Sequence, residues 1–309
     1  MKKWVVGFLG MALIMLIFLY ILIPDTIALN GNTGVKVTQS GLYRMLINKN
    51  SIQKWWPGEV SSDMNFSLHG YDYRFYENIS ALPVTISDKK TSLKTSLYLI
   101  SLETDSIKLA WVGAISVPYN PIFRWQTWKK ANRLNQDMNI ILKAMKTYYT
   151  KDENIYGIKV LKEFVKDSLL VSTLANSTGY PTTPFIYHLV AKLRNYAYKN
   201  SAKETGFPML NIQTKDSVQY EVKVALPLDR PLPNSGDISE KRMLGKGNIL
   251  VTEIKGGIEA TSKAFTQINQ YAIDYQRIQP AIAFYSLVSD RTIETDSTKW
   301  ITKIYCPIR

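Results

Sequence analysis

The chain has 309 residues, 46% of them hydrophobic and 20% charged, values that are typical of globular proteins, so two domains are expected and extensive disorder is excluded. A single cysteine, Cys306, excludes an internal disulfide and a thiolate metal cluster, and we expect it to be a buried structural thiol. The two histidines, His69 and His188, lack acidic neighbours at ligand spacing, so no metal and no cofactor is predicted. The net charge of +13 comes from scattered Lys and Arg, which is typical of a solvated surface. Binding to an anionic membrane surface is the second explanation of this charge, and binding to nucleic acid is the third.

The first element in chain order is an apolar run over residues 4–24 that contains no charged side chain. About 20 such residues let a helix cross a hydrocarbon core. Lys2 and Lys3 precede the run and the next basic residue is Lys36, so the N-terminus is expected in the cytoplasm. Residues 1–25 are therefore predicted to be an uncleaved transmembrane signal anchor, with a cleaved signal peptide as the alternative. The chain would be a single-pass protein of the bacterial inner (cytoplasmic) membrane whose soluble domains are exported to the periplasm.

Residues 26–150 form the first predicted soluble domain. A helix capped by Ser40 ends at Trp55-Trp56-Pro57-Gly58, because proline and glycine interrupt helices. Residues 65–117 contain short runs of alternating apolar and polar residues, which predict an antiparallel sheet. From residue 125 to 149 apolar residues recur at helical spacing on one face, with charged residues such as Asp137 elsewhere. A long helix is therefore expected to close the domain over the sheet.

This order of elements, together with the segment Lys54-Trp55-Trp56-Pro57-Gly58, resembles the START-like helix-grip family of the SRPBCC, polyketide cyclase/dehydrase type. The resemblance implies an apolar cavity between sheet and helix that binds lipid-like or aromatic molecules. Trp111, Trp128 and Met138 are the candidate ligand-binding residues, and a filled core is the alternative. No carboxylate pair or His–Asp arrangement is evident in this domain, so no catalytic residue is predicted.

A polar break at Lys151-Asp152-Glu153-Asn154 separates the second predicted domain, residues 155–309. Thr183 is expected to cap a helix whose first helical position is Pro184. A second helix is expected after Lys255-Gly256-Gly257. Each helix belongs to one copy of a strand-helix-strand-strand pattern, so the pattern occurs twice. Its strands are predicted over residues 158–171, 208–212, 217–227, 249–254, 281–288 and 300–308.

Four segments of this domain resemble the gyrase-inhibitor-like (GyrI-like), AraC-effector-binding family: Tyr220-Glu221-Val222 before Pro227, Lys255-Gly256-Gly257 before a helix, Ser289-Asp290, and the ending over residues 300–308. The family implies a duplicated sheet whose central groove binds hydrophobic, often cationic, small molecules. The chain departs from the family in two ways. The DNA-binding helix-turn-helix is missing, and Tyr285 and Leu287 stand where many relatives have a groove glutamate and a tyrosine, which argues against a regulator or hydrolase role.

The candidate groove residues are Tyr220 and Tyr285 as aromatic walls and Glu221 or Glu253 as the partner of a ligand cation, with a solvated sheet face as the alternative for each glutamate. The predicted fold class is α+β, with an N-terminal transmembrane helix, a helix-grip antiparallel sheet domain and a duplicated strand-helix-strand-strand domain. The predicted function is a membrane-anchored small-molecule binding or sensing protein. A cyclase-like or hydrolase-like enzyme and a protein-interaction scaffold are the alternatives. The expected partners are a hydrophobic small molecule and the membrane, without nucleic acid, and no protein partner is identified.

Overall fold

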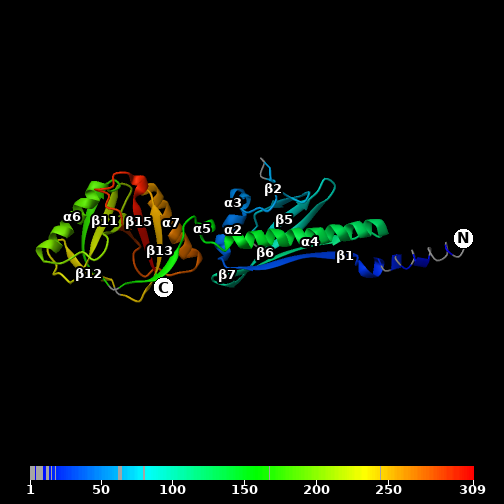
Figure 1. Ribbon diagram of the computed structural model, residues 1–309, viewed down its shortest axis with the longest axis horizontal. Helices are drawn as coiled ribbons and strands as arrows, with labels where there is room; N and C mark the ends of the chain where they lie inside the picture. Colours follow the sequence, from blue (N-terminus) through cyan, green and yellow to red (C-terminus); the bar gives the residue numbers. More distant parts are fainter. Residues whose placement is uncertain are drawn as a thin grey trace. The chain divides into compact units, whose positions relative to one another are not determined.

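The chain forms two compact units, Met1–Lys151 (unit 1) and Asp152–Arg309 (unit 2), each with its own antiparallel sheet (Figure 1). The division falls at the polar break found in the sequence. This computed structural model describes residues 4, 10–11, 14, 16–17, 19–61, 65–78, 81–166, 168–243 and 245–309.

The sheet of unit 1 has seven strands in the order β1-β7-β6-β5-β4-β3-β2. Alternation decides which side chains face the core: in β5, Leu82, Val84 and Ile86 are buried and the residues between them are half-buried. Two short helices, α2 (Gln39–Leu46) and α3 (Lys49–Gln53), separate the first two strands. The strands are β1 (Thr26–Val35), β2 (Glu59–Val60), β3 (Phe66–Leu68), β4 (Tyr71–Phe75), β5 (Leu82–Ser87), β6 (Ser92–Glu103) and β7 (Ser106–Ser116).

The long helix α4 (Pro121–Tyr149) lies along this sheet (Figure 1). It begins four residues before the predicted start, because the Asn120 side chain accepts hydrogen bonds from the first backbone N–H groups and Pro121 suits the first helical position. Strand β1 approaches the helix so closely at Gly31 that a Cβ there would lie 2.9 Å from Leu142 Cδ1. The buried positions of α4 are Arg124, Ala131, Leu134, Asp137, Met138, Ile141, Leu142, Met145 and Tyr149.

The Trp-Trp-Pro-Gly segment of unit 1 has a structural role. Trp55 Nε1 donates to the Tyr149 hydroxyl at 2.7 Å, which ties the segment to the last turn of α4. Trp56 Nε1 donates to the Ser67 carbonyl at 3.0 Å. At Gly58 a Cβ would lie 2.0 Å from the same carbonyl oxygen, so only glycine fits this approach. The segment therefore holds the end of α4 against the sheet, which accounts for its unusual composition without a ligand.

The sheet of unit 2 has eight strands in the order β12-β9-β11-β10-β14-β15-β13-β8. Its helices are α5 (Glu153–Tyr156), α6 (Thr183–Lys199) and α7 (Ile258–Asp274), with one 3-10 turn, η1 (Ser297–Lys299). Helix α6 is capped by Thr182, one residue before the predicted cap. The strands are β8 (Leu161–Phe164), β9 (Ser168–Thr178), β10 (Met209–Thr214), β11 (Gln219–Leu228), β12 (Ser239–Met243), β13 (Asn248–Lys255), β14 (Phe284–Leu287) and β15 (Ile301–Ile308).

The strand-helix-strand-strand pattern occurs twice in unit 2, as β9-α6-β10-β11 and as β13-α7-β14-β15, so the predicted duplication is confirmed. The two halves meet where β10 pairs with β14, through Met209–Ser286 and Leu210–Tyr285. We call this line the seam. The edge strand β12, in a Pro-rich and polar stretch, was not expected from the sequence.

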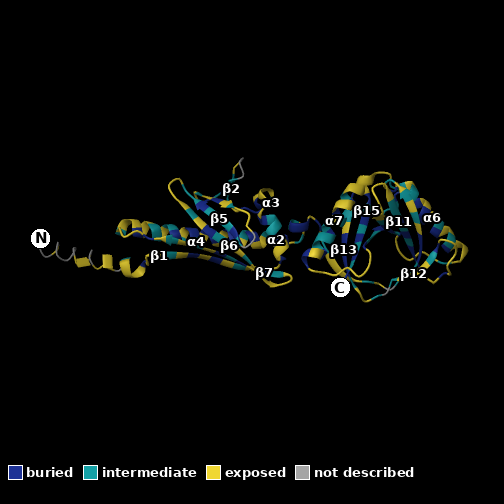
Figure 2. Cartoon of the chain, turned by 180° about the vertical axis from the view of Figure 1, so that it is seen from behind, coloured by how far each residue is buried: buried dark blue, intermediate teal, exposed yellow. Residues whose placement is uncertain are grey.

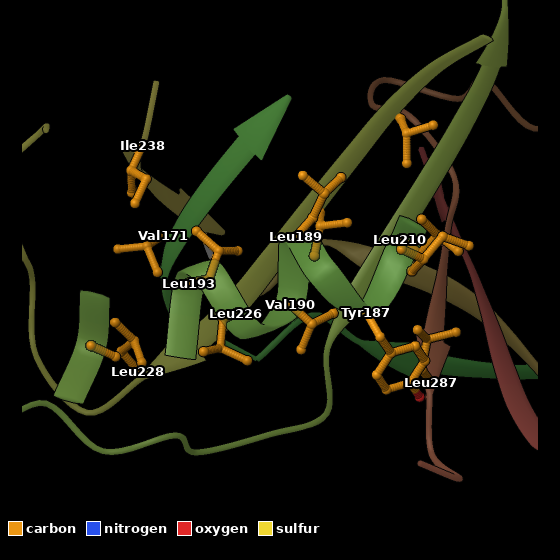
Figure 3. Close-up of a cluster of buried hydrophobic side chains, with 14 of the residues drawn as sticks. Val171, Tyr187, Leu189, Val190, Leu193, Leu210, Leu226, Leu228, Ile238 and Leu287 are labelled. Carbon is orange, nitrogen blue, oxygen red and sulfur yellow. The ribbon is translucent and has the colours of Figure 1, made fainter. Parts of the chain in front are cut away.

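The two long helices of unit 2, α6 and α7, cover one face of its sheet, which we call the covered face; the other is the open face (Figure 2). Figure 3 shows Leu189, Val190 and Leu193 of α6 packed against Leu226 and other apolar side chains of the sheet. The even-numbered residues of β11 and β15 belong to the covered face, and the odd-numbered residues to the open face. Cys306 is on the covered face and completely buried, and burial raises the pKa of its thiol to about 11, as expected for a structural cysteine.

The predicted transmembrane anchor at residues 1–25 is wrong. A membrane-spanning helix needs about 20 consecutive apolar residues, and in the described part of the chain no helix combines that length with that apolar character. Within the segment, residues 1–3, 5–9, 12–13, 15 and 18 lie outside the described residues. The fold class is corrected to α+β with two antiparallel sheets. The predicted membrane partner and the single-pass inner-membrane location, with exported domains, are not supported either.

Candidate functional site

The ligand-binding residues predicted for unit 1 lie in or beside its core. Trp111 and Met138 are completely buried, and Trp111 Nε1 donates to Thr95 Oγ1 at 2.8 Å. Trp128 is half-buried on α4 and stacks on Trp125 with ring centroids 5.0 Å apart. Trp111 and Met138 fill the interface between helix and sheet, and Trp128 lies at its edge. This arrangement agrees with the alternative that the core is filled and holds no ligand. The START-like resemblance remains a prediction.

A His–Asp pair, which the sequence analysis missed, joins the sheet of unit 1 to α4. His69 Nδ1 lies 2.6 Å from Asp137 Oδ1, and the Tyr73 hydroxyl donates to Asp137 Oδ2 at 3.4 Å. Asp137 is completely buried, although its charge suggested the polar side of the helix. The sequence feature that could have revealed this pair is the position of Asp137, which adjoins the buried Met138 on α4. The pair satisfies a buried carboxylate and ties the β3–β4 turn to α4.

The groove residues predicted for unit 2 are divided between the two faces of its sheet. Tyr220 and Tyr285 are on the covered face, where Tyr220 contacts Tyr180 with ring centroids 5.6 Å apart and Tyr285 contacts Phe265 at 5.1 Å. Glu221 and Glu253 are on the open face. Because neighbouring residues of a strand point to opposite faces, Tyr220 and Glu221 do not contact the same ligand.

Each of the two predicted glutamates is paired with a lysine. Glu221 Oε2 lies 3.4 Å from Lys215 Nζ, and Glu253 Oε2 lies 3.6 Å from Lys303 Nζ. Glu253 is also largely exposed. Neither carboxylate is therefore the buried, uncompensated charge that would select a ligand cation.

The open face contains a groove of about 440 Å³ at the seam. It takes side chains from both halves of the duplication: Met209 and Pro227 come from the first, and Ile249, Phe284 and Tyr305 from the second. Its complete lining is Glu163, Phe164, Val165, Lys166, Ser168, Thr205, Gly206, Phe207, Met209, Pro227, Met243, Ile249, Phe284, Ser286, Lys303 and Tyr305.

Aromatic side chains dominate the groove. Phe284 and Tyr305 pair across β14 and β15, and their rings stack 5.1 Å apart with an interplanar angle of 14°. Two further rings, those of Phe164 and Phe207, remain 72% and 51% exposed. Exposed apolar rings beside a concave surface are typical of binding sites. A flat apolar molecule would find a stacking surface here.

The charged groups of the groove are Lys166, Lys303 and Glu163. The pKa of Tyr305 is raised first by burial and then by the nearby carboxylates Glu163 and Glu253. Its phenol therefore stays protonated at neutral pH and can donate a hydrogen bond. The lining offers two cations, one anion and a neutral donor, and the pairing of Lys303 with the largely exposed Glu253 is weakened by solvent. This balance does not favour a cationic ligand.

The chain is similar in structure to several solved proteins, and these are the only similarities that the comparisons found. No family model matches the chain, and no curated protein matches it. The crystal structure of the EcmrR C-terminal domain is 13% identical over 49% of this chain and 98% of that one, with a TM-score of 0.43. A hydrolase from Listeria innocua is 11% identical over 49% and 92%, with a TM-score of 0.39. SAV2435 bound to tetraphenylphosphonium is 16% identical over 49% and 94%, with a TM-score of 0.32. At TM-scores below 0.5, none of these likenesses assigns a function.

Proposed function

We propose that unit 2 binds a flat hydrophobic small molecule in the groove of its open face. The observation that carries this proposal is the groove itself, about 440 Å³ lined by the stacked pair Phe284–Tyr305 and the exposed rings of Phe164 and Phe207. Pockets of roughly 300–1,000 Å³ with mainly apolar linings are the usual sites for small ligands. Sensing or carriage of such a molecule is the corresponding biological role.

The ligand of this proposal is neutral or anionic instead of cationic. Lys166 and Lys303 line the groove against one carboxylate of the lining, Glu163, while Glu253, which pairs with Lys303, is largely exposed to solvent. The sequence-based choice of Glu221 as a cation partner is not supported, because Glu221 is six residues, about 20 Å along β11, from the groove residue Pro227. Glu253 lies beside the groove, where it pairs with Lys303 and raises the pKa of Tyr305, but it does not line the groove.

Catalysis is not part of the proposal. Among the described groove residues, the phenol of Tyr305 stays protonated and Lys303 is paired with Glu253, so neither is poised as a nucleophile with an adjacent base. The scaffold alternative is also left aside, because stacked and exposed rings in a concave site fit a small molecule better than a flat protein surface.

Fluorescence titration with two matched probes tests the proposal: neutral N-phenyl-1-naphthylamine and its 8-sulfonate derivative. We expect both to bind the full chain and the sulfonate to bind more tightly. Phe284→Ala removes half of the stacked pair and should raise both Kd values about tenfold. Phe207→Ala, at an exposed rim position, is a second test that leaves the sheet intact. The control is Tyr198→Ala, at an 85% exposed residue of α6, which should change neither Kd.

Lys303→Gln removes one positive charge from the groove while largely keeping its shape, so it tests whether this charge selects the ligand. It should abolish the preference for the sulfonate probe while leaving the Kd of the neutral probe unchanged. Tetraphenylphosphonium, a hydrophobic cation, should compete weakly. Probe binding that is unaffected by both Phe284→Ala and Phe207→Ala contradicts the groove, and strong competition by tetraphenylphosphonium contradicts the proposed ligand charge.

A further inference from the structure

Arg291 is a buried cation on the covered face of unit 2 and has no role in the groove. Its side chain Nη2 donates to Thr302 Oγ1 at 2.9 Å, and the guanidinium carbon lies 4.6 Å from the centre of the Trp300 ring. The residue is only 9% exposed. Within the described ranges of the chain, no carboxylate forms an ion pair with Arg291, and its Nε and Nη1 have no hydrogen-bond partner.

A buried guanidinium without a counter-ion is energetically unfavourable. Burial itself lowers the pKa of Arg291, yet arginine remains charged at any physiological pH. Contact with Trp300 offsets only part of the lost hydration, since a cation–π contact contributes roughly 0.5–2 kcal/mol, whereas transfer of an unpaired ion into a protein interior costs several kcal/mol. An anion that entered from outside would offset this cost.

The surroundings of Arg291 are suited to an anion. A small cavity on the covered face is lined by Arg291, Tyr180, Tyr285, Thr183, Thr261 and Ser262. Among the cavity residues that the structure describes there is no carboxylate. Burial raises the pKa of Tyr180 and of Tyr285, so both phenols remain neutral and able to donate hydrogen bonds.

The first turns of both long helices of unit 2 also reach this cavity. Thr183 is the first residue of α6, and Thr261 belongs to the first turn of α7. Helix α7 is preceded by Gly257, which offers no side chain to cap its backbone N–H groups, and the one acidic residue of its first turn, Glu259, does not line the cavity. Helix N-termini carry partial positive charge and attract anions. The duplication therefore directs two helix N-termini to the same buried cation.

We propose that the Arg291 cavity binds the carboxylate group of a small organic acid. Its volume of about 20 Å³ accommodates little more than one water molecule, so the headgroup must be small. A planar carboxylate presents two oxygens that match the geometry of a guanidinium. The remainder of the acid lies at the mouth of the cavity beside Tyr180 and Ile258. This site is on the face opposite to the groove and does not depend on the function proposed for it.

Isothermal titration calorimetry of the full chain with benzoate and with neutral benzamide tests the site. We expect benzoate to bind with one-to-one stoichiometry and benzamide to bind at least tenfold more weakly. Arg291→Gln should raise the Kd for benzoate about tenfold or more. Tyr180→Phe keeps the aromatic ring and the charge of Arg291 but removes a hydroxyl donor, and it should raise the Kd for benzoate about threefold. If Arg291→Gln does not fold, Tyr180→Phe decides the outcome.

Two controls separate this site from general charge effects and from the groove. Arg230→Gln removes an exposed arginine of the same unit and should leave benzoate binding unchanged. Phe284→Ala, which weakens groove binding, should leave it unchanged as well. Chloride and inorganic phosphate are titrated in parallel and should compete more weakly than benzoate. Equal binding of benzoate and benzamide, tighter binding of chloride or phosphate, or a benzoate Kd that is unaffected by Arg291→Gln overturns the proposal.

Discussion

The two units cover their sheets with helices in different ways, and this difference decides where space is left for a ligand. In unit 1 the long helix α4 lies along the sheet, and completely buried side chains such as Trp111 and Met138 fill the interface. In unit 2 each half of the duplication has its own shorter helix, and the strands of the two halves pair through Met209–Ser286 and Leu210–Tyr285. Both proposed sites of unit 2, the groove and the Arg291 cavity, lie at this seam on opposite faces of the sheet.

Trp111→Ala tests the filled core of unit 1 and should have the largest effect. Trp111 is completely buried, contacts Tyr73 and donates a hydrogen bond to Thr95. Truncation of such a side chain costs about 3–5 kcal/mol of unfolding free energy. Urea denaturation followed by far-UV circular dichroism measures the loss. Trp125→Ala, at an exposed tryptophan of α4, is the control and should cost less than about 1 kcal/mol.

A Trp111→Ala variant that unfolds no more easily than Trp125→Ala contradicts the comparison. In that case Trp111 borders an accessible cavity, and unit 1 would be a second ligand-binding unit instead of a filled one.

Asp88→Asn tests how α4 is held at the β5–β6 turn. The carboxylate of Asp88 accepts a hydrogen bond from Lys130 of α4 and others from the backbone N–H groups of Lys90 and Thr91. These bonds, that of Lys130 first, hold the pKa of Asp88 below its usual range. Because the pKa is lower in the folded than in the unfolded protein, the stabilisation is present at neutral pH and is lost as the pH falls below about 4.

We expect Asp88→Asn to lower the unfolding free energy by about 0.5–1 kcal/mol at pH 7, the range of partly exposed ion pairs. The difference from the original protein should shrink as the pH approaches about 2. Thermal unfolding at a series of pH values measures both effects, with Asp105→Asn in the β6–β7 turn as the control. A difference that stays constant over this pH range shows that the charge of Asp88 does not hold α4.

A fragment of residues 152–309 tests whether unit 2 folds independently of unit 1. Its thermal stability and its ligand affinities should differ least from those of the full chain. The fragment contains both halves of the duplication, all eight strands of its sheet and every residue of the two proposed sites. We expect one cooperative thermal transition at the temperature of unit 2 in the full chain, and unchanged Kd values for both naphthylamine probes. Loss of cooperative unfolding in the fragment contradicts a two-unit organisation.

Most helices and strands could be predicted because their signals are local. The apolar spacing after residue 125 predicted α4, and the polar break at residues 151–154 marked the division between units. The apolar run at residues 4–24 shows the limit of such reasoning, since length and hydropathy alone led to a transmembrane helix that the described structure does not support. Asp137 shows another limit, because a charged residue was assigned to the polar side of α4 while the structure buries it beside His69.

The candidate site was predicted less well than the fold. The family resemblance of Tyr220-Glu221-Val222 predicts one groove for Tyr220 and Glu221, although neighbours in a strand face opposite sides of a sheet. Nothing in the local sequence of Glu253 indicates its pairing with Lys303, 50 residues away in the chain. Arg291 was not identified, because nothing in its local sequence indicates burial.

The sequence by itself determined the two units, the α+β class, the duplicated strand-helix-strand-strand order and the structural character of Cys306. These follow from periodicity, helix-capping residues and breaks, all of which act over a few residues. Only the tertiary structure decided which side chains share a site: the stacking of Phe284 on Tyr305, and the burial of Arg291 among Tyr180, Tyr285 and Trp300. The physical reason is that strand pairing and helix packing join residues that are distant in sequence, and these contacts set the burial and the charge environment on which binding depends.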